Sequence, residues 1–246
     1  MSIMPVLTGR VALVTGGSRG IGSAVALVLA EAGADVAVNY RERAREAEQV
    51  AAAIRAAGRR AFAVGADVSD GVAVAGMLRT VEATLGPVDV LVNNAGMAII
   101  RSVDELTEAE FDLTLAVNLK SAFLCTQAVL PGMRAQRWGR IVNISSGAAR
   151  GAGGIGVHYN ASKAGMEGLT RGYAARLVKA GITVNAVAPS LIDTDMMSAR
   201  RDQYVARIPL GRMGTPAEVA QVVLLVMGNE YMTGQTVQLN GGTSFI

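Results

Sequence analysis

Residues 11–22 read VALVTGGSRGIG, so that an apolar run passes directly into a glycine-rich turn. Glycines at positions 16, 20 and 22 allow the backbone to turn tightly and to approach a pyrophosphate, because no Cβ atom is in the way. Apolar residues at helical spacing follow in Ile21–Glu31, and the positive end of a helix there would face the same anion. A strand–loop–helix order of this kind predicts a nucleotide site rather than only a tight turn.

Along the rest of the chain, runs rich in β-branched residues alternate with Ala-rich helical patterns. The predicted strands are Val11–Thr15, Asp35–Asn39, Ala61–Gly65, Val88–Asn93, Arg140–Ser145, Ile182–Ala186 and Thr236–Leu239. The predicted helices are Ile21–Glu31, Ala44–Ala57, Val72–Leu85, Glu108–Gln136, Tyr159–Lys179 and Pro216–Met227. This alternation with short connections predicts an α/β fold: one doubly wound parallel sheet of about seven strands, flanked by helices and formed by a single domain over residues 1–246.

One segment breaks the alternation, between residues 189 and 215. It contains Pro189, Pro209, Gly211 and Gly214, and it leaves the predicted sheet at a carboxyl edge, where open α/β sheets bind ligands. A connection of this length within a compact domain usually has a function. We interpret residues 189–215 as a lid over the substrate, with short helices of its own as one option.

Composition narrows the kind of protein. The chain has 246 residues, of which 51% are hydrophobic, and its net charge of +3 is spread too evenly to favour nucleic acid. A single cysteine, Cys125, indicates a reducing compartment, and its apolar surroundings predict an inert buried thiol. The single histidine, His158, argues against a histidine metal site, and no metal is expected. The start has no signal-peptide pattern, and an apolar run such as Val222–Met227 is too short to span a membrane. We therefore expect a cytoplasmic protein.

The end of the second predicted strand indicates which nicotinamide cofactor fits. NAD sites usually place a carboxylate there, to bind the ribose hydroxyls. This chain has Asn39, Tyr40 and Arg41 instead. Arg19 in the glycine loop and Arg41 could both pair with the 2′-phosphate of NADP(H), although two solvated surface arginines would give the same pattern. The sequence favours NADP(H) over NAD(H).

Two more strand ends fall on the same edge of the sheet. Asp67 and Val68 close the third strand, and Asn94, Ala95 and Gly96 close the fourth. The small residues would let a flat ring lie against the backbone. Asp67 could instead only cap the following helix.

Tyr159 and Lys163 are four residues apart, which places both on one face of a helix. An ammonium beside a phenol favours the phenolate, so the pair could exchange a proton with a substrate oxygen near neutral pH. The same spacing arises by chance on many solvated helices. The pair therefore gains weight only from the other motifs.

Together these motifs resemble the short-chain dehydrogenase/reductase family over essentially the whole chain. The similarity rests on six motifs in the family's order: residues 15–22, 93–96, Asn118, Ser145-Ser146, Tyr159-x-x-x-Lys163 and residues 184–189. It implies a Rossmann-like domain and a catalytic set of Asn118, Ser146, Tyr159 and Lys163. Ser146 is chosen over Ser145 because it precedes Tyr159 by the family's usual separation.

The resemblance also implies a role for each residue. Ser146 would bind the substrate carbonyl, Tyr159 would protonate its oxygen, and Lys163 would lower the pKa of Tyr159 and bind the nicotinamide ribose. Asn118 would hold a water that connects Lys163 with solvent, and Ser145 would line the cofactor side. The expected cofactor contacts are Gly16, Ser18, Arg19, Gly20, Ile21, Gly22, Asn39, Tyr40, Arg41, Asp67, Val68, Asn94, Ala95, Gly96, Tyr159, Lys163, Pro189, Ile192 and Thr194.

Within the family the chain is most similar to the 3-oxoacyl-(acyl carrier protein) reductases. That similarity implies reduction of a ketone by NADPH, with a 3-oxoacyl thioester on acyl carrier protein or CoA as the expected substrate, and a homotetramer. Ala180 stands where such enzymes often have a basic residue for the carrier, although Arg137 and Lys179 could serve. Specificity is expected in residues 97–102, 148–157 and 189–212.

Two alternatives remain. One is an alcohol or sugar dehydrogenase of the same family. The other is a regulator that binds NADP(H) without catalysis, and the complete set of Asn118, Ser146, Tyr159 and Lys163 counts against it. A hydride-transfer assay separates these possibilities.

Overall fold

The computed structural model describes residues 7–195 and 201–245. Seven parallel strands form one sheet in the order β3-β2-β1-β4-β5-β6-β7, which confirms the predicted α/β fold with a seven-stranded parallel sheet. The strands are β1 (Val11–Val14), β2 (Asp35–Tyr40), β3 (Ala61–Gly65), β4 (Val90–Asn93), β5 (Gly139–Ile144), β6 (Ile182–Pro189) and β7 (Thr236–Leu239).

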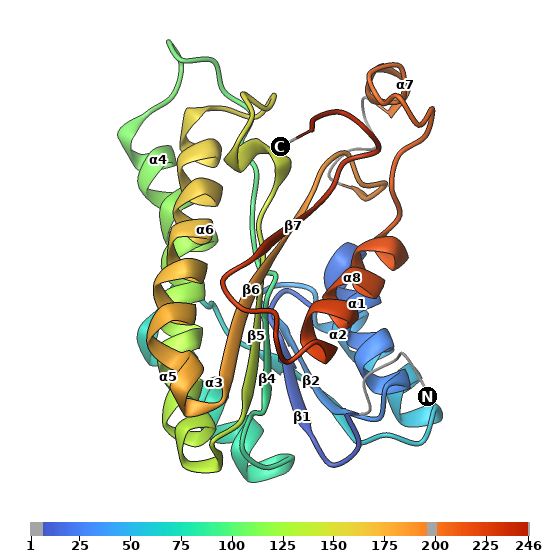
Figure 1. Ribbon diagram of the computed structural model, residues 1–246, viewed down its shortest axis with the longest axis vertical. Coiled ribbons are helices and arrows are strands. Elements are labelled where there is room, and N and C mark those ends of the chain that lie inside the picture. Colours follow the sequence, from blue (N-terminus) through green and yellow to red (C-terminus); the bar gives the residue numbers. More distant parts are fainter. Residues whose placement is uncertain (1–6, 196–200, 246) are drawn as a thin grey trace.

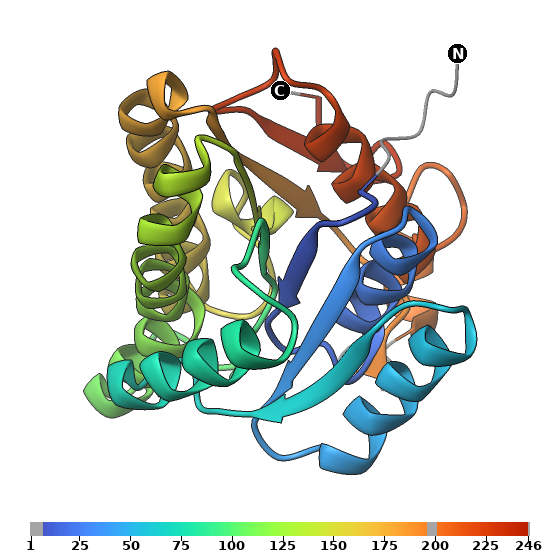
Figure 2. The same ribbon diagram turned by 90° about the horizontal axis from the view of Figure 1, so that it is seen from below.

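Helices cover both faces of this sheet. They are α1 (Gly20–Glu31), α2 (Ala44–Ala56), α3 (Gly71–Thr84), α4 (Glu108–Leu115), α5 (Ser121–Gln136), α6 (Val157–Leu177), α7 (Arg201–Val205) and α8 (Pro216–Gly228), with short turns η1 (Ala116–Lys120), η2 (Gly147–Ala149) and η3 (Val178–Ala180). Helices α1, α2 and α8 lie on one side of the sheet, and α3, α4, α5 and α6 lie on the other (Figures 1 and 2).

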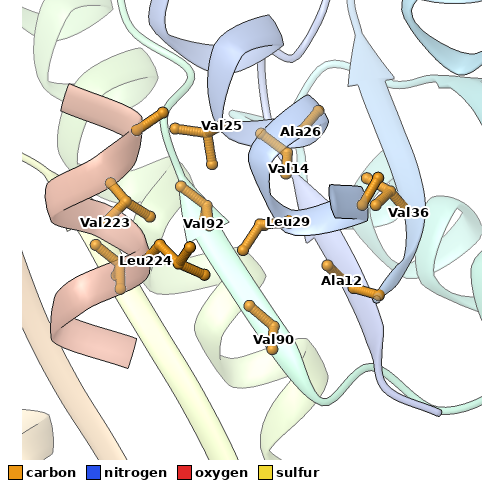
Figure 3. Close-up of a cluster of buried hydrophobic side chains, with 14 of the residues drawn as sticks. Ala12, Val14, Val25, Ala26, Leu29, Val36, Val90, Val92, Val223 and Leu224 are labelled. Carbon is orange, nitrogen blue, oxygen red and sulfur yellow. The ribbon is translucent and has the colours of Figure 1, made fainter. Parts of the chain in front are cut away.

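Alternate residues of each strand face opposite helix layers, as the pleat of a strand requires. Ala12 and Val14 of β1 pack with Val25 of α1 and Val223 of α8 in the first core (Figure 3). Leu13, between them, belongs to the second core, beneath α3, α5 and α6. Because both faces of the central strands are buried, those strands appear in the sequence as continuous apolar runs.

The predicted helix Glu108–Gln136 differs from the structure. It consists of α4 and α5, joined by the π-helical turn η1, in which Asn118 lies. Single π-helical turns often occur at functional sites, and propensity alone does not mark them.

One helical stretch of the described residues, Glu108–Gln136, is long and apolar enough to cross a membrane by length and composition. Half of its most apolar window is buried inside the fold. A core helix of a globular domain meets the same criteria, so the stretch is weak evidence for a membrane span.

The strand order reverses between β1 and β4, and the connections after β4, β5 and β6 extend beyond the same edge of the sheet, at the top of Figure 1. Doubly wound sheets bind their ligands in the crevice at this switch point. The predicted site residues come from these connections and from the start of α1.

Candidate active site

The glycine loop after β1 has the backbone that its sequence predicts. Gly16 and Gly20 have φ of +61° and +55°. A Cβ atom on Gly22 would lie 2.3 Å from the carbonyl oxygen of Gly16, so only glycine fits there. The side-chain amide of Asn94 donates through Nδ2 to the carbonyls of Thr15 and Gly16, at 2.9 and 3.0 Å. These two hydrogen bonds fix the loop to the end of β4.

The start of α1 fits an anion. Arg19 is its N-cap residue and makes no side-chain cap hydrogen bond among the described residues. The helices α3, α4 and α8 are capped instead by Asp70, Thr107 and Thr215. No side chain of the described residues caps the first turn of α1, so a pyrophosphate could accept hydrogen bonds from the backbone amides there, at Gly20 and Ile21. Ser18 precedes this turn and lies beside the same position. The cradle therefore fits a dinucleotide.

At the end of β2, the predicted cofactor contacts separate into buried and exposed residues. Asn39 is buried, and its side chain accepts from Gly16 N–H and donates to the carbonyls of Tyr40, Val64 and Ala66. It therefore connects the glycine loop with β2 and β3. Arg41 is half-exposed and pairs with the Glu42 carboxylate, whereas Arg19 pairs at 2.9 Å with Asp195, in the segment predicted as a lid.

Asp67 and Val68 follow β3. The Asp67 carboxylate accepts from the amide and hydroxyl of Ser69. These hydrogen bonds, with the nearby Arg41, hold the pKa of Asp67 below its usual value. Val68 is buried, and Asp70 rather than Asp67 caps α3, so capping does not explain Asp67.

Gly96 joins the two sides of the site. A Cβ atom on it would lie 3.4 Å from Asn118 Oδ1 and 3.6 Å from Lys163 Nζ. The preceding residue, Ala95, donates its amide to Thr15 Oγ1. The β4 end thus brings the glycine loop close to two of the four predicted catalytic residues.

Asn118 is fully buried in η1. Its Oδ1 accepts from Met97 N–H at 2.8 Å, and its Nδ2 donates to Met97 O and to Ser162 Oγ. The side chain therefore holds the segment after β4 against α6. Its hydrogen bonds fix its orientation beside Lys163.

Lys163 is buried, and its Nζ donates to the carbonyl oxygen of Ile144, the last residue of β5, at 2.8 Å. Nζ lies 5.8 Å from the centre of the Tyr159 ring, as expected for neighbours on one helix face. Burial lowers the pKa of Lys163 to about 8. The ammonium is therefore much easier to deprotonate than an exposed one.

Tyr159 and Ser146 share a side-chain hydrogen bond, and Ser146 Oγ also accepts from Ala148 N–H. Burial raises the pKa of Tyr159, and the bond with Ser146 opposes that effect. Desolvation is the larger of the two effects, so the phenol of Tyr159 is less acidic in the folded protein than in a free tyrosine. Ser145 differs from expectation: it is buried and donates to Lys163 O, so it holds α6 against β5.

The segment predicted as a lid begins where β6 ends at Pro189. Ile192 pairs with Gly214, which closes the segment into a loop. A Cβ atom on Gly20 would lie 3.4 Å from Thr194 Cγ2, so Thr194 covers the glycine loop. Residues 196–200 of the predicted lid lie outside the described residues, and α7 follows them.

The sequence did not single out three groups that position the site. Thr15 Oγ1 accepts from the amides of Asn94 and Ala95. Met97 and Ile144 act only through backbone atoms, as partners of Asn118 and Lys163. Of these, Thr15 lies at the start of the predicted glycine loop and Met97 in the predicted specificity segment 97–102, whereas Ile144 had no signal in sequence.

Other candidate chemistry is limited. Burial raises the pKa of the Cys125 thiol to about 12, which fits the predicted inert thiol. Within residues 7–195 and 201–245, no group of three or more His, Cys, Asp or Glu residues is arranged to hold a metal ion.

A glycine cradle at the switch point, together with the buried Tyr159 and Lys163 and the half-buried Ser146, is the arrangement expected of a nucleotide-dependent oxidoreductase. The profile of the short chain dehydrogenase family matches residues 10–205. The chain belongs to the short-chain dehydrogenase/reductase family and is an NAD(P)-dependent oxidoreductase.

Several relatives match nearly the whole chain. The 3-oxoacyl-[acyl-carrier-protein] reductase FabG of Staphylococcus aureus is 44% identical and covers 94% of this chain and 96% of its own. The (2S)-[(R)-hydroxy(phenyl)methyl]succinyl-CoA dehydrogenase subunit BbsD of Thauera aromatica is 41% identical, over 97% of this chain and 98% of its own. A crystal structure of a short chain dehydrogenase from Burkholderia cenocepacia in complex with NADP has 41% identity and a TM-score of 0.89, over 97% and 99% of the two chains.

Proposed function

We propose that this protein is an NADPH-dependent ketoreductase, in which Tyr159 gives a proton to the oxygen of a ketone. The observation that carries this proposal is the buried cluster at the end of β5. There the hydroxyls of Tyr159 and Ser146 share a hydrogen bond, and Lys163 Nζ is fixed by the carbonyl of Ile144. A protonated phenol at this position suits a general acid.

Each residue has a defined task in this mechanism. Ser146 donates to the ketone oxygen and orients it toward Tyr159, which transfers its proton to that oxygen. Lys163 stabilises the phenolate that remains, because a positive charge lowers the energy of a nearby anion. Asn118 keeps the Met97 backbone and α6 in place around Lys163. The cofactor, when bound, supplies the hydride.

NADP(H) is the proposed cofactor. Gly16, Ser18, Gly20, Ile21 and Gly22 would hold its pyrophosphate, with Arg19 and Arg41 at its 2′-phosphate. Residues near the nicotinamide and its ribose would be Asn94, Ala95, Gly96, Tyr159, Lys163, Pro189, Ile192 and Thr194. Arg41 could exchange Glu42 for a phosphate at little cost, because an exposed ion pair is weak. The NADP complex of the Burkholderia relative supports the choice.

The proposed substrate is a 3-oxoacyl thioester or a related ketone. Two relatives support a thioester: one is named for acyl carrier protein substrates and the other for a CoA ester. The second is named a dehydrogenase, which keeps alcohol oxidation as the alternative direction. Both directions would use the same four residues, with Tyr159 as the base in oxidation. We propose the cytoplasm as the location and residues 189–215 as the substrate lid.

A homotetramer is the proposed assembly. An apolar groove of about 790 Å³ lies between α4, η1, α5 and α6. Leu115, Leu119, Phe123, Leu169 and Tyr173 contribute to its wall, and the side chain of Phe123 is 42% exposed. Exposed apolar grooves of this kind mark interaction sites, and a second copy would cover this one.

The test is a panel of ketones with NADPH and NADH, spanning acetoacetyl thioesters, keto esters and cyclic ketones, read as cofactor oxidation. Turnover of a 3-oxoacyl thioester with NADPH is the expected result. Tight NADPH binding with no turnover of any ketone, or of the matching alcohols with NADP⁺, would favour the non-catalytic regulator. Turnover of alcohols alone would support the dehydrogenase.

A further inference from the structure

The only histidine of the chain lies beside the proposed proton donor but has no task in the mechanism above. His158 is fully buried and precedes Tyr159 on α6. Its ring Nε2 lies 3.0 Å from the carbonyl oxygen of Ile99, in the segment that follows β4. A carbonyl oxygen only accepts, so the proton of this hydrogen bond is on Nε2.

The surroundings of the ring leave little freedom. Gly156 has φ of +152°, and a Cβ atom on it would lie 2.6 Å from His158 Cε1 and 3.2 Å from Arg101 O. Glycine at this position therefore allows the ring and the segment after β4 to approach each other. A second hydrogen bond, from Arg101 N–H to Ile155 O at 3.0 Å, joins the same two segments.

The other end of the segment is held as well. Met97 exchanges two hydrogen bonds with Asn118, through its N–H and its carbonyl. Residues 97–101 are therefore fixed at one end by Asn118 and at the other by His158 and Ile155. Both of these attachments lead directly to residues of the proposed catalytic set, since His158 is the neighbour of Tyr159.

Apolar side chains are exposed at the fixed end. Ile100 is 50% exposed, and Val157, the neighbour of His158, is 53% exposed. Large apolar side chains left in water near a site suit an apolar ligand. Their relative position depends on the distance between Ile99 and α6, which the His158 hydrogen bond sets.

We propose that His158 is a positioning residue, whose Nε2–H holds residues 97–101 against the start of α6 and so places Ile100 beside the apolar part of the ketone. The proposal rests on the proposed ketoreductase function. It assigns the ketone an apolar chain or ring on the side of its carbonyl that faces Ile100. His158 itself touches neither the ketone nor the cofactor, and it acts through the Ile99 backbone.

Two variants of matched size separate the hydrogen bond from packing. In His158→Gln, the amide Nε2–H can occupy the place of the ring Nε2–H. In His158→Met, the side chain has a similar length and no donor. His158→Asn is the third variant: it keeps a donor, but one too short to reach Ile99 O.

We expect His158→Met to raise KM for an apolar ketone at least fivefold, with kcat within threefold and the Kd of NADPH within twofold of the parent values. His158→Gln should stay within twofold in all three. Amide hydrogen exchange of a peptide covering residues 97–103 gives a readout without turnover. Exchange should be at least tenfold faster in His158→Met and near the parent rate in His158→Gln.

Equal effects of the Gln and Met variants on KM would overturn the proposal, because packing alone would then explain them. The proposal is also overturned if amide exchange in His158→Met is as slow as in the parent. It is likewise overturned if exchange in His158→Met is faster but KM is unchanged. If His158→Met does not fold, His158→Asn replaces it with the same expectations. If the parent protein reduces no ketone, the proposed function fails. The attachment of residues 97–101 to His158 is tested separately by hydrogen exchange, and it is rejected if exchange in His158→Met is no faster than in the parent.

Discussion

The carbonyl oxygen of Ile144 accepts a hydrogen bond from Lys163 Nζ at 2.8 Å, at the point where β5 ends and the segment carrying Ser146 begins. A backbone atom of the central sheet thus fixes the ammonium, while Ser145 holds the Lys163 backbone from the same strand end. The strand end therefore determines where α6 presents both Lys163 and Tyr159. Because Nζ is buried, its charge is costly to the fold.

The first prediction concerns this cost. The pKa of Lys163 is lowered from 10.5 to about 8, so between those values the unfolded chain binds one more proton than the folded protein. The free energy of unfolding contributed by Lys163 therefore rises with pH across this window. Lys163→Met removes that rise. The stability of the variant relative to the parent should fall by roughly 2 kcal/mol from pH 7 to pH 10, because each pKa unit corresponds to about 1.4 kcal/mol.

Urea unfolding at pH 7, 8, 9 and 10 measures this difference. The pH dependence is informative even though the variant also leaves Ile144 O without its donor, because that loss does not change with pH. Lys179→Met is the control, since Lys179 is exposed at the end of the same helix region. A difference that stays constant with pH for Lys163→Met would show that Lys163 is not held with a lowered pKa.

The second prediction tests the proton donor. Tyr159→Phe removes the hydroxyl that shares a hydrogen bond with Ser146 and leaves the ring in its buried place. General acid catalysis typically contributes a factor of about 10² to 10⁴, so kcat for ketone reduction should fall by that amount. The Kd of NADPH, measured by fluorescence titration, should change by less than about fivefold. Tyr231→Phe, at a fully exposed tyrosine, is the control and should match the parent. A variant with near-parent kcat would mean that another group gives the proton.

The third prediction concerns the choice of cofactor. Arg41→Ala removes a cation whose present partner is Glu42, and Arg19→Ala removes one that pairs with Asp195. A charge-assisted hydrogen bond contributes about 1.5 to 3 kcal/mol, so each variant should weaken NADPH binding by roughly 10- to 100-fold. NADH binding should change by less than about threefold, because NADH has no 2′-phosphate.

Arg43→Ala is the matched control for Arg41→Ala. Arg43 is two residues away, similarly exposed and paired with Glu46. Its loss should leave the ratio of the NADPH and NADH dissociation constants near the parent value. If Arg41→Ala and Arg43→Ala change this ratio equally, then only the general positive charge of the loop matters.

Much of the architecture could be predicted from sequence, because the patterns that specify it are local. The β1 strand and its glycine loop lie within twelve consecutive residues, and Asp70 and Thr215 cap α3 and α8 as their side chains suggest. The π-helical turn at Asn118 could not be predicted in this way. It depends on the hydrogen bonds of Asn118 to Met97 and Ser162, which are distant in sequence.

The same limit applies to the site. Tyr159 and Lys163 could be paired from helix spacing, but their protonation could not. The acidity of Tyr159 depends on how deeply the surrounding loops bury it, and burial outweighs the hydrogen bond with Ser146. Likewise, Asn39 stands at the predicted place, yet its partners Val64 and Ala66 come from the adjacent strand region. Such partners are known only once the sheet register is known.

The fourth prediction concerns assembly. The proposed tetramer needs the groove between α5 and α6 to be covered, and Phe123 offers an exposed aromatic ring in its wall. Phe123→Glu would place a charge in that contact, which is costly to bury without a partner. Sedimentation velocity should then show smaller species than the parent, while circular dichroism remains unchanged because the side chain is exposed within one subunit.

Val72→Glu introduces the same charge at a residue of α3 that is 82% exposed and lies outside the groove. This control should sediment as the parent does. If Phe123→Glu also sediments as the parent does, the groove is not an interface between copies. If Val72→Glu and Phe123→Glu shift equally, the cause is net charge rather than the loss of an apolar contact.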